Sequence, residues 1–513
     1  MACSHVRLHE SFRSFRVRSY AWDRRFGRCN YPSSSPGMPI RPILRHFAAA
    51  TFASVSAFAQ QQGTPAQQPV PPPAQMTGDI RSAVVDTVAA ELIRFYAVAD
   101  TGQLIADHLR ERLAAGAYDN LTDPRLFAEA VGADMRAINH DKHLALLIGP
   151  AGFGLGMARI PQPQPANGPT PPNYPPAVLE AARRSNFGLG RVEVLPGNVG
   201  YLQINGFPGV LGPAQEAIVN GLRYLAGTDA VILDFREHGG GSGALSNFLI
   251  SHFVGDDTVH VLDVEVRSGG RKTSRYTLAQ VPGPRRPTVP VFILVGRGTV
   301  SAGEDFAFVM KNLGRATLVG EPTAGAGRNN PSFDAGHGFA ASISVSRVSD
   351  PKTGAEWEGV GVVPNVRTPV RAALSEAHQL ALTALAEKET NPTRKHEYEL
   401  AKEYAAAQAK PHKVALQVLT GYEGRYGEQR VVTVEEGKLI YRVDATRPGI
   451  EMVALNDSVF AVSAAGRIGF ERDPKSGYRM VNRPLVGTPL VFERKGPPPK
   501  IPSEYQIESG KPE

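Results

Sequence analysis

The strongest constraint on the fold is a series of short, nearly continuous apolar runs between residues 195 and 350. They read "VGYLQING", "DAVILDFR", "TVPVFILVG", "RATLVGEP" and "GFAASISVSRVSD", and helical patterns such as "GPAQEAIVNGLRYLAG" and "GGGSGALSNFLISHFVG" lie between them. Strands without polar alternation are typical of sheets that are covered on both faces, and strands separated by helices form mostly parallel sheets. The pattern therefore predicts an α/β core over residues 195–390, built on a mostly parallel, covered sheet.

Other modules flank this core. Residues 79–150 repeat apolar residues at helical spacing, as in "IRSAVVDTVAAELIRFYA", which predicts a helical N-terminal module. Residues 151–194 include "PQPQPANGPTPPNYPP" and are interpreted as a proline-rich connection. Residues 391–513 begin with a helical pattern and continue as short alternating strands with Gly and Asp turns, which predicts a small all-β barrel or sandwich.

The first 78 residues have the pattern of a leader. Residues 38–59, "MPIRPILRHFAAATFASVSAFA", combine a short basic start, an apolar run and an A-x-A site, which indicates a signal peptide cleaved near Ala59. A disordered leader or a poor anchor is the alternative. We interpret residues 1–37 as a dispensable extension before Met38, and residues 60–78 as a Gln/Pro-rich linker. Both cysteines, Cys3 and Cys29, precede the cleavage site, so we expect a periplasmic or secreted protein without disulfides.

Charge and motifs exclude several functions. The formal net charge is +7, but removing residues 1–59 leaves 47 basic and 47 acidic residues, so we expect neither a nucleic-acid nor an anionic-membrane partner. The sequence shows no P-loop, no G-x-G-x-x-G fingerprint and no evident cluster of metal ligands. We therefore expect no cofactor, no metal and no stable membrane span.

The segment "GRGTVSAGEDF" places Ser301 where an apolar strand gives way to a helix. Serine is a favoured N-cap, and Glu304 three residues later completes a capping box, so spacing alone leaves a cap and a nucleophile both open. Acyl transfer also needs at least two N–H donors for the developing oxyanion. Ala302 offers one at the helix start. Gly240 in "HGGG" is the best candidate for the other, with Gly239 next.

These motifs resemble a known family. "GYLQINGF", "AVILDFREHGGG", "VFILVGRGTVSAGEDFAFVMKN", "LVGEPTAGA" and "EGVGVVPNV" occur in the order seen in the tail-specific (C-terminal processing) proteases, whose relatives include the tricorn core and interphotoreceptor retinoid-binding protein. The resemblance implies a ClpP/crotonase-like fold and a serine peptidase with Ser301 as nucleophile. The helical module resembles that of the retinoid-binding branch, and the C-terminal β segment resembles lipocalin-like domains.

The resemblance also indicates which side chain acts as the base that activates Ser301. The processing proteases use a Ser/Lys dyad, but their lysine position is Ala326 here, and Arg328 stays protonated and cannot replace it. The tricorn-like branch uses Ser, His and Glu. By resemblance, His143 in "NHDKHLALLI" matches the base and Glu358 in "WEGVGVVPNV" matches its orienting acid.

Some features depart from the family or stay open. Lys142 stands where the tricorn core has a serine, which puts a fourth catalytic member in doubt. His140, His238 and His337 are rival bases, and His238 stands where the family usually has Asn. About 45 residues separate the helical module from the core, which leaves no room for the PDZ module of most processing proteases.

The sequence therefore predicts an exported serine peptidase that acts on peptides or unfolded polypeptide without a PDZ module. The alternative is a non-catalytic module for hydrophobic ligands such as retinoids or lipids, for which the retinoid-binding branch is a precedent. An acyl-CoA enzyme shares only the fold, and export argues against it because acyl-CoA is cytosolic.

Overall fold

The computed structural model describes residues 75–149 and 174–506. The expected leader and most of the expected linker lie outside these residues. None of the helices in the described ranges combines the length and the apolar character that crossing a membrane requires.

The first described helices form one hydrophobic core with a later part of the chain. Helices α1 (Gly78–Phe95), α2 (Ala99–Ala114) and α3 (Pro124–Arg136) confirm the expected helical module. Their buried faces share a cluster with Phe339, Ala341 and Ile343. This later segment belongs to a three-stranded antiparallel sheet in the order β1 (Ala145–Ile148), β10 (Phe339–Ser342) and β9 (Ser332–Gly336). The helical module is therefore completed by residues that follow it by about 200 positions.

The centre of the protein is a six-stranded sheet in the order β12-β8-β7-β4-β3-β2. Its strands are β2 (Leu189–Leu195), β3 (Val199–Ile204), β4 (Ala230–Asp234), β7 (Val291–Val295), β8 (Thr317–Gly320) and β12 (Val366–Arg367). All neighbouring pairs are parallel except β2 and β3. Every residue of β4 and β7 is buried, as the apolar runs predict.

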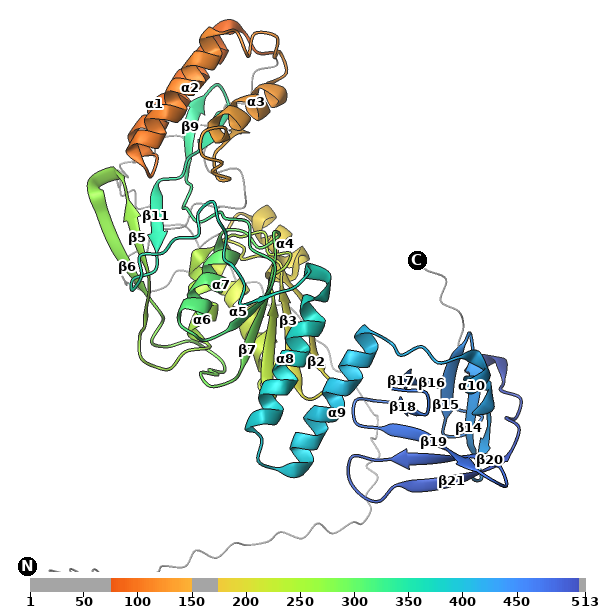
Figure 1. The fold of residues 1–513 in the computed structure, drawn as a ribbon. Coiled ribbons are helices and arrows are strands. Elements are labelled where there is room, and N and C mark those ends of the chain that lie inside the picture. The colour runs from red at the N-terminus through yellow and green to blue at the C-terminus, as the bar shows by residue number, and fades with distance from the viewer. Residues whose placement is uncertain (1–74, 150–173, 507–513) are drawn as a thin grey trace, which may run out of the picture. The chain divides into compact units, whose positions relative to one another are not determined.

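Helices cover both faces of this sheet (Figure 1). Val231 and Leu233 pack in one core cluster with α5 (Leu211–Tyr224), α6 (Gly243–Ser251) and α7 (Ala302–Asn312). Ala230 and Ile232 pack in another with α8 (Ala373–Lys388) and α9 (Pro392–Ala409). Because successive side chains of a strand point to opposite faces, one apolar run serves both layers.

Two sequence predictions differ from the structure. The segment "GFAASISVSRVSD" is not another strand of the central sheet. It divides into β10 and β11 (Ser346–Ser349), which lie in different antiparallel sheets, and β11 pairs with β5 (His260–Val266) beside β6 (Arg271–Tyr276). The alternation of buried and exposed residues in β11 fits a sheet with one solvated face. The connection at 151–194 also holds α4 (Pro176–Arg184) and β2 within its described part.

The C-terminal part confirms the expected all-β segment and favours a barrel. After α10 (Leu416–Gly421), nine strands pair antiparallel in the order β16-β15-β14-β13-β21-β20-β19-β18-β17. The two end strands, β16 and β17, are separated only by Met452, whose N–H bonds Leu439 O at 2.8 Å. The sheet therefore closes on itself through one continuous segment. The strands are β13 (Gly424–Tyr426), β14 (Arg430–Glu435), β15 (Lys438–Arg442), β16 (Ile450–Glu451), β17 (Val453–Ala454), β18 (Val459–Ala461), β19 (Arg467–Asp473), β20 (Gly477–Arg483) and β21 (Leu490–Gly496).

Short 3-10 helices complete the described elements. They are η1 (Asn186–Gly188), η2 (Ser268–Gly270), η3 (Val370–Ala372) and η4 (Ser503–Tyr505).

Candidate active site

Ser301 lies in a strained turn between β7 and α7. The N–H of Gly303 bonds Val300 O at 3.0 Å, and Ser301 has φ 51° and ψ −113°. These angles correspond to the first central position of a type II′ turn, which glycine normally occupies. A non-glycine residue in such a region costs about 1 to 3 kcal/mol, and such residues cluster at active sites. The structure thus places Ser301 at the predicted strand-to-helix junction, in a backbone conformation that sequence spacing did not indicate.

Glu304 holds this turn to the next one along the sheet. Its carboxylate accepts hydrogen bonds from the N–H of Ser301 at 2.9 Å and from Thr323 Oγ1 at 2.6 Å. It also accepts from the N–H groups of Gly325 at 2.6 Å and Ala326 at 2.8 Å. Burial raises the pKa of Glu304, and these hydrogen bonds oppose that rise. The capping-box bond from Ser301 N–H is therefore one of four that fix the backbone around the serine.

Glu358 binds the same glycine turn from another side. Its Oε2 accepts a hydrogen bond from Gly327 N–H at 2.6 Å. Burial, and next the negative charge of Asp141, raise the pKa of Glu358 to about 7. Three consecutive amides of the turn, at residues 325 to 327, are thus held by Glu304 and Glu358.

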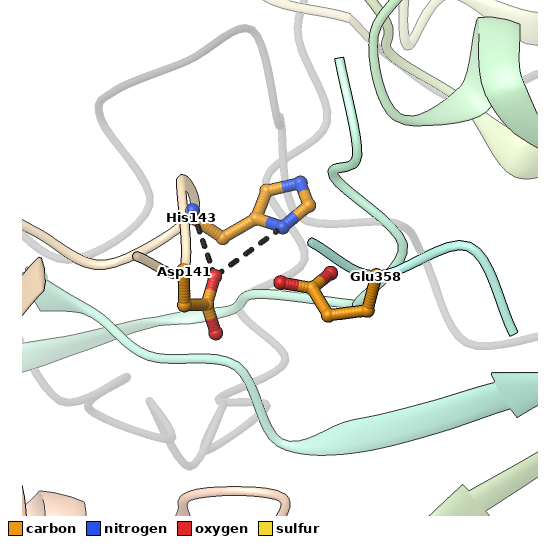
Figure 2. Close-up of side chains that lie close together, drawn as sticks. All are labelled: Asp141, His143 and Glu358. Atoms are coloured by element: carbon orange, nitrogen blue, oxygen red, sulfur yellow. Dashed lines mark hydrogen bonds and ion pairs between the residues drawn. The ribbon is translucent and has the colours of Figure 1, made fainter. Parts of the chain in front are cut away.

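His143, Asp141 and Glu358 lie together, with the Glu358 carboxylate pointing toward the imidazole (Figure 2). Asp141 Oδ1 accepts a hydrogen bond from the backbone N–H of His143 at 2.9 Å and lies 3.8 Å from its Nδ1. Both Asp141 and His143 are buried. Burial lowers the pKa of His143. A neutral imidazole beside carboxylates is the form that can accept a proton.

Asp141 is a site residue that the sequence reasoning missed. Its Oδ2 accepts a hydrogen bond from Tyr96 Oη at 2.9 Å and lies 3.6 Å from Arg328 Nη1. Arg328 Nη1 also donates to Tyr96 Oη at 2.7 Å. The D-x-H spacing in "DKH" was the available signal for Asp141, whereas the positions of Tyr96 and Arg328 depend on the fold.

The backbone of His143 and the strand that follows it are held by β10. Ser342 Oγ donates to the carbonyl of His143 at 2.7 Å, and β1, which follows His143, pairs with β10. The neighbouring Lys142 Nζ donates to Ala324 O. The loop that carries His143 is therefore attached both to β10 and to the turn that Glu304 organises.

The structure assembles two groups of the predicted residues. One group is His143 with Glu358, and the other is Ser301 with Gly240. Both ring nitrogens of His143 are buried without a hydrogen-bond partner among the described residues, so no hydrogen bond joins them to Ser301. Catalytic hydrogen bonds are often long in unliganded enzymes and tighten when substrate binds.

The predicted oxyanion donors lie beside Ser301. A Cβ atom on Gly240 would be 3.1 Å from Ser301 Cβ, and Gly240 has φ +97°, so glycine permits both the close approach and the conformation. The N–H of Gly240 donates to His238 Nδ1 at 3.1 Å in this structure. Ala302 is the first residue of α7, where amides have no intrahelical acceptor. Gly241 also lines the cavity next to Ser301 and Ala302.

The rival histidines have other surroundings. His238 is fully buried, stacks on Phe235 with ring centroids 4.8 Å apart, and burial lowers its pKa to about 3. It acts here as a neutral acceptor for Gly240. His140 and His337 are exposed.

The cluster around His143 could also hold a metal ion, contrary to the impression from the sequence. Ligand atoms of Asp141, His143 and Glu358 all lie within 4.8 Å of one another. One imidazole and two carboxylates form a ligand set that suits Zn²⁺. Asp141 and His143 are two residues apart, but Glu358 follows them by more than 200 positions, which is why no spacing motif indicated the set.

The central segment matches a known family. Residues 198–368 match the family model described as Peptidase family S41. This segment is therefore similar to the S41 peptidases. The matched segment includes Ser301, Gly240 and Glu358, whereas His143 precedes it.

Curated relatives agree with this family. The chain is 29% identical over 175 residues to carboxyl-terminal-processing peptidase 2, chloroplastic, of Arabidopsis thaliana, which covers 33% of this chain and 32% of that protein. It is 30% identical over 157 residues to the carboxyl-terminal-processing protease of Synechocystis sp., and the match covers 30% of this chain and 34% of that protein. The resemblance to the tail-specific proteases, a family of serine-type peptidases, is thereby confirmed. The chain spans about a third of the length of these relatives.

Solved structures are similar at low identity. A lipoprotein from Streptococcus agalactiae is 16% identical and covers 59% of this chain and 96% of its own, with a TM-score of 0.41. The photosystem II D1 C-terminal processing protease is 15% identical, and the match covers 58% of this chain and 95% of that chain, with a TM-score of 0.37.

Proposed function

We propose that this protein is a serine peptidase that hydrolyses peptide bonds with Ser301 as nucleophile and His143 as base. The observation that carries the proposal is the strained turn at Ser301. The buried carboxylate of Glu304 bonds the N–H of Ser301 and the neighbouring glycine turn, and the half-buried carboxylate of Glu358 bonds the next amide of that glycine turn. A backbone held against its preferred conformation at a helix start, beside glycine amides, is the arrangement that acyl transfer requires.

The proposed reaction follows from these positions. Ser301 Oγ attacks the carbonyl carbon of the scissile bond while His143 takes the hydroxyl proton. The oxyanion receives hydrogen bonds from the Ala302 amide and from Gly240, whose N–H turns from His238 toward the substrate. His143 then protonates the leaving amine, and water hydrolyses the acyl-enzyme by the reverse proton path.

The acids orient the imidazole in this proposal. Asp141 and Glu358 both lie close to His143, and Asp141 is fixed by Tyr96 and Arg328. Either carboxylate can accept a hydrogen bond from Nδ1–H and so stabilise the positive charge that develops on the ring. Closure of His143 onto Ser301 upon substrate binding completes the path. We also propose that the protein is exported and binds unfolded polypeptide without a PDZ module, as the sequence predicts.

The Ser/Lys mechanism has little support here. The position of the family's lysine is Ala326, which is buried and lines the cavity beside Ser301. The nearby Lys142 Nζ donates to the carbonyl of Ala324, so it approaches this turn from the helical module. A general base must lie within hydrogen-bond reach of the proton that it accepts, whereas the hydrogen bond of Lys142 Nζ is to a backbone carbonyl.

A fluorophosphonate probe tests the proposal. Wild-type protein is expected to be labelled at Ser301, while Ser301→Ala and His143→Ala are not labelled. His140→Ala removes an exposed histidine three residues from His143 and serves as the matched control. Cleavage of an unfolded casein substrate is measured in parallel. Folded wild-type protein that neither reacts with the probe nor cleaves casein would overturn the proposal and favour a ligand-binding module.

A further inference from the structure

The cavity beside Ser301 has an unusual lining. Its volume is about 140 Å³, and Ser301 and Ala302 lie on its wall together with Arg275, Arg328 and Trp357. A cavity needs about 10 to 15 Å³ of volume measured in this way to hold one water molecule, so this cavity has room for several waters or for a small ligand group. A short side chain or a chain terminus therefore fits in it.

Three buried N–H groups of this lining have no acceptor. They are Arg275 Nε, Arg328 Nε and Trp357 Nε1, which lack a hydrogen-bond partner within the described residues. Trp357 is only 3% exposed, so water has little access to its indole. Buried polar groups are normally hydrogen-bonded, and several unpaired donors around one cavity call for an acceptor that the chain itself does not supply.

The two arginines are fixed at their outer ends. Arg275 Nη2 donates to Asp305 Oδ1 at 2.7 Å, and Asp305 Oδ2 accepts from Ser246 Oγ. Arg328 is attached to Asp141 and Tyr96 through Nη1. Each guanidinium is therefore held in one orientation while its Nε–H stays unpaired. Arg275 is paired with Asp305 and Arg328 with Asp141, so what each arginine still offers to the cavity is its unpaired Nε–H.

We propose that this cavity binds a carboxylate of the substrate and thereby positions the scissile bond at Ser301. The proposal rests on the proposed peptidase function and specifies its substrate class. Guanidinium groups recognise carboxylates through paired, charge-assisted hydrogen bonds, and the fixed orientation lowers the entropic cost of forming them. The carboxylate belongs either to an acidic side chain next to the scissile bond or to the C-terminus of a peptide. Both sources present the same two acceptor oxygens.

Binding to the Ser301→Ala protein tests this inference without requiring catalysis. Four peptides of one parent sequence are compared by isothermal titration calorimetry. They carry a single Glu or Gln, each with a free or an amidated C-terminus. A carboxylate site that rejects its amide analogue is expected to favour the bound acid by about tenfold or more. The Glu/Gln pair reports on an acidic side chain, and the acid/amide pair reports on the terminus.

Variants identify the residues responsible. Arg275→Gln and Trp357→Phe in the Ser301→Ala background are expected to reduce the preference for the carboxylate to below about threefold. Arg271→Gln changes the same charge on the same strand at an exposed position and is expected to leave the preference intact. Circular dichroism establishes that each variant is folded, and Arg275→Lys, which keeps the charge, supplies a second measurement if Arg275→Gln does not fold.

The outcomes separate this inference from the peptidase function. Equal affinity for all four peptides, or an unchanged preference in Arg275→Gln, overturns the carboxylate site. Probe labelling of wild-type Ser301 would then still support the peptidase. Conversely, a clear carboxylate preference in a protein whose wild type is not labelled would retain the binding site and reject the reaction.

Discussion

Replacing Ser301 by glycine should stabilise the protein while it abolishes activity. Ser301 occupies the glycine position of a type II′ turn, with φ 51° and ψ −113°. Relief of that strain is worth about 1 to 3 kcal/mol, and the extra freedom of glycine in the unfolded chain costs roughly 0.5 to 1 kcal/mol. The difference leaves a net gain of about 1 kcal/mol, a factor of about five in the unfolding equilibrium.

Ser301→Ala is the matched comparison, because it removes the hydroxyl and keeps the strained backbone. The assay is urea unfolding followed by the fluorescence of Trp357, whose ring lies 4.6 Å from that of Phe308 in α7. Protein expressed from Met38 has Trp357 as its single tryptophan, so the signal reports on this helix. Ser301→Gly should unfold at a higher urea concentration than Ser301→Ala. Equal or lower stability of Ser301→Gly would refute the strain at this position.

Three further outcomes are expected. Glu304→Gln loses an acceptor for at least one of the four hydrogen bonds to Glu304, so it should lower the free energy of unfolding by about 2 kcal/mol and weaken probe labelling of Ser301. Unchanged unfolding and labelling would contradict the proposal that Glu304 fixes the backbone around Ser301. The pKa of Glu358 is raised to about 7, so the folded protein binds the carboxyl proton of Glu358 more tightly than the unfolded chain does. Protonated Glu358 therefore contributes to stability below the ordinary carboxyl pKa, and this contribution is lost as the pH rises through about 7. Glu358→Gln should therefore stabilise the protein more at pH 8 than at pH 5, and urea unfolding at the two pH values measures this difference. An equal change in stability at both pH values would contradict a raised pKa for Glu358. Zn²⁺ should bind at Asp141, His143 and Glu358, and equilibrium dialysis should show one ion per chain. The His143→Ala variant should not retain this ion, and full retention by that variant would show that the ion binds elsewhere.

The sequence predicted the parts of the fold that depend on local pattern. The runs that became β4 and β7 are fully buried, as continuous apolar strands require. Local pattern could not place β10 and β11 in separate sheets, because the pairing of β10 with β1 joins residues about 195 positions apart. It also could not foresee that the helical module needs Phe339 to complete its core.

The same limit applies to the site. Ser301 and Glu304 are close in sequence, so their capping relation was predictable, and their bond is present. The bonds from Glu304 to the turn at 325–326 connect two strand ends, and no spacing rule describes them. Asp141 was overlooked although it lies two residues from His143, because its role depends on Tyr96 and Arg328, which approach it from distant parts of the chain.

The pairing of β1 with β10 has a consequence for synthesis. The loop that carries His143 gains its contacts with β10 only when Ser342 and its strand have emerged and folded against it. A chain that has already formed the turn at Ser301 therefore still lacks these contacts at His143, the base in the proposed mechanism. In the proposed mechanism the serine of such a half-folded chain remains an ordinary alcohol, so the unfinished peptidase would digest neither itself nor its neighbours.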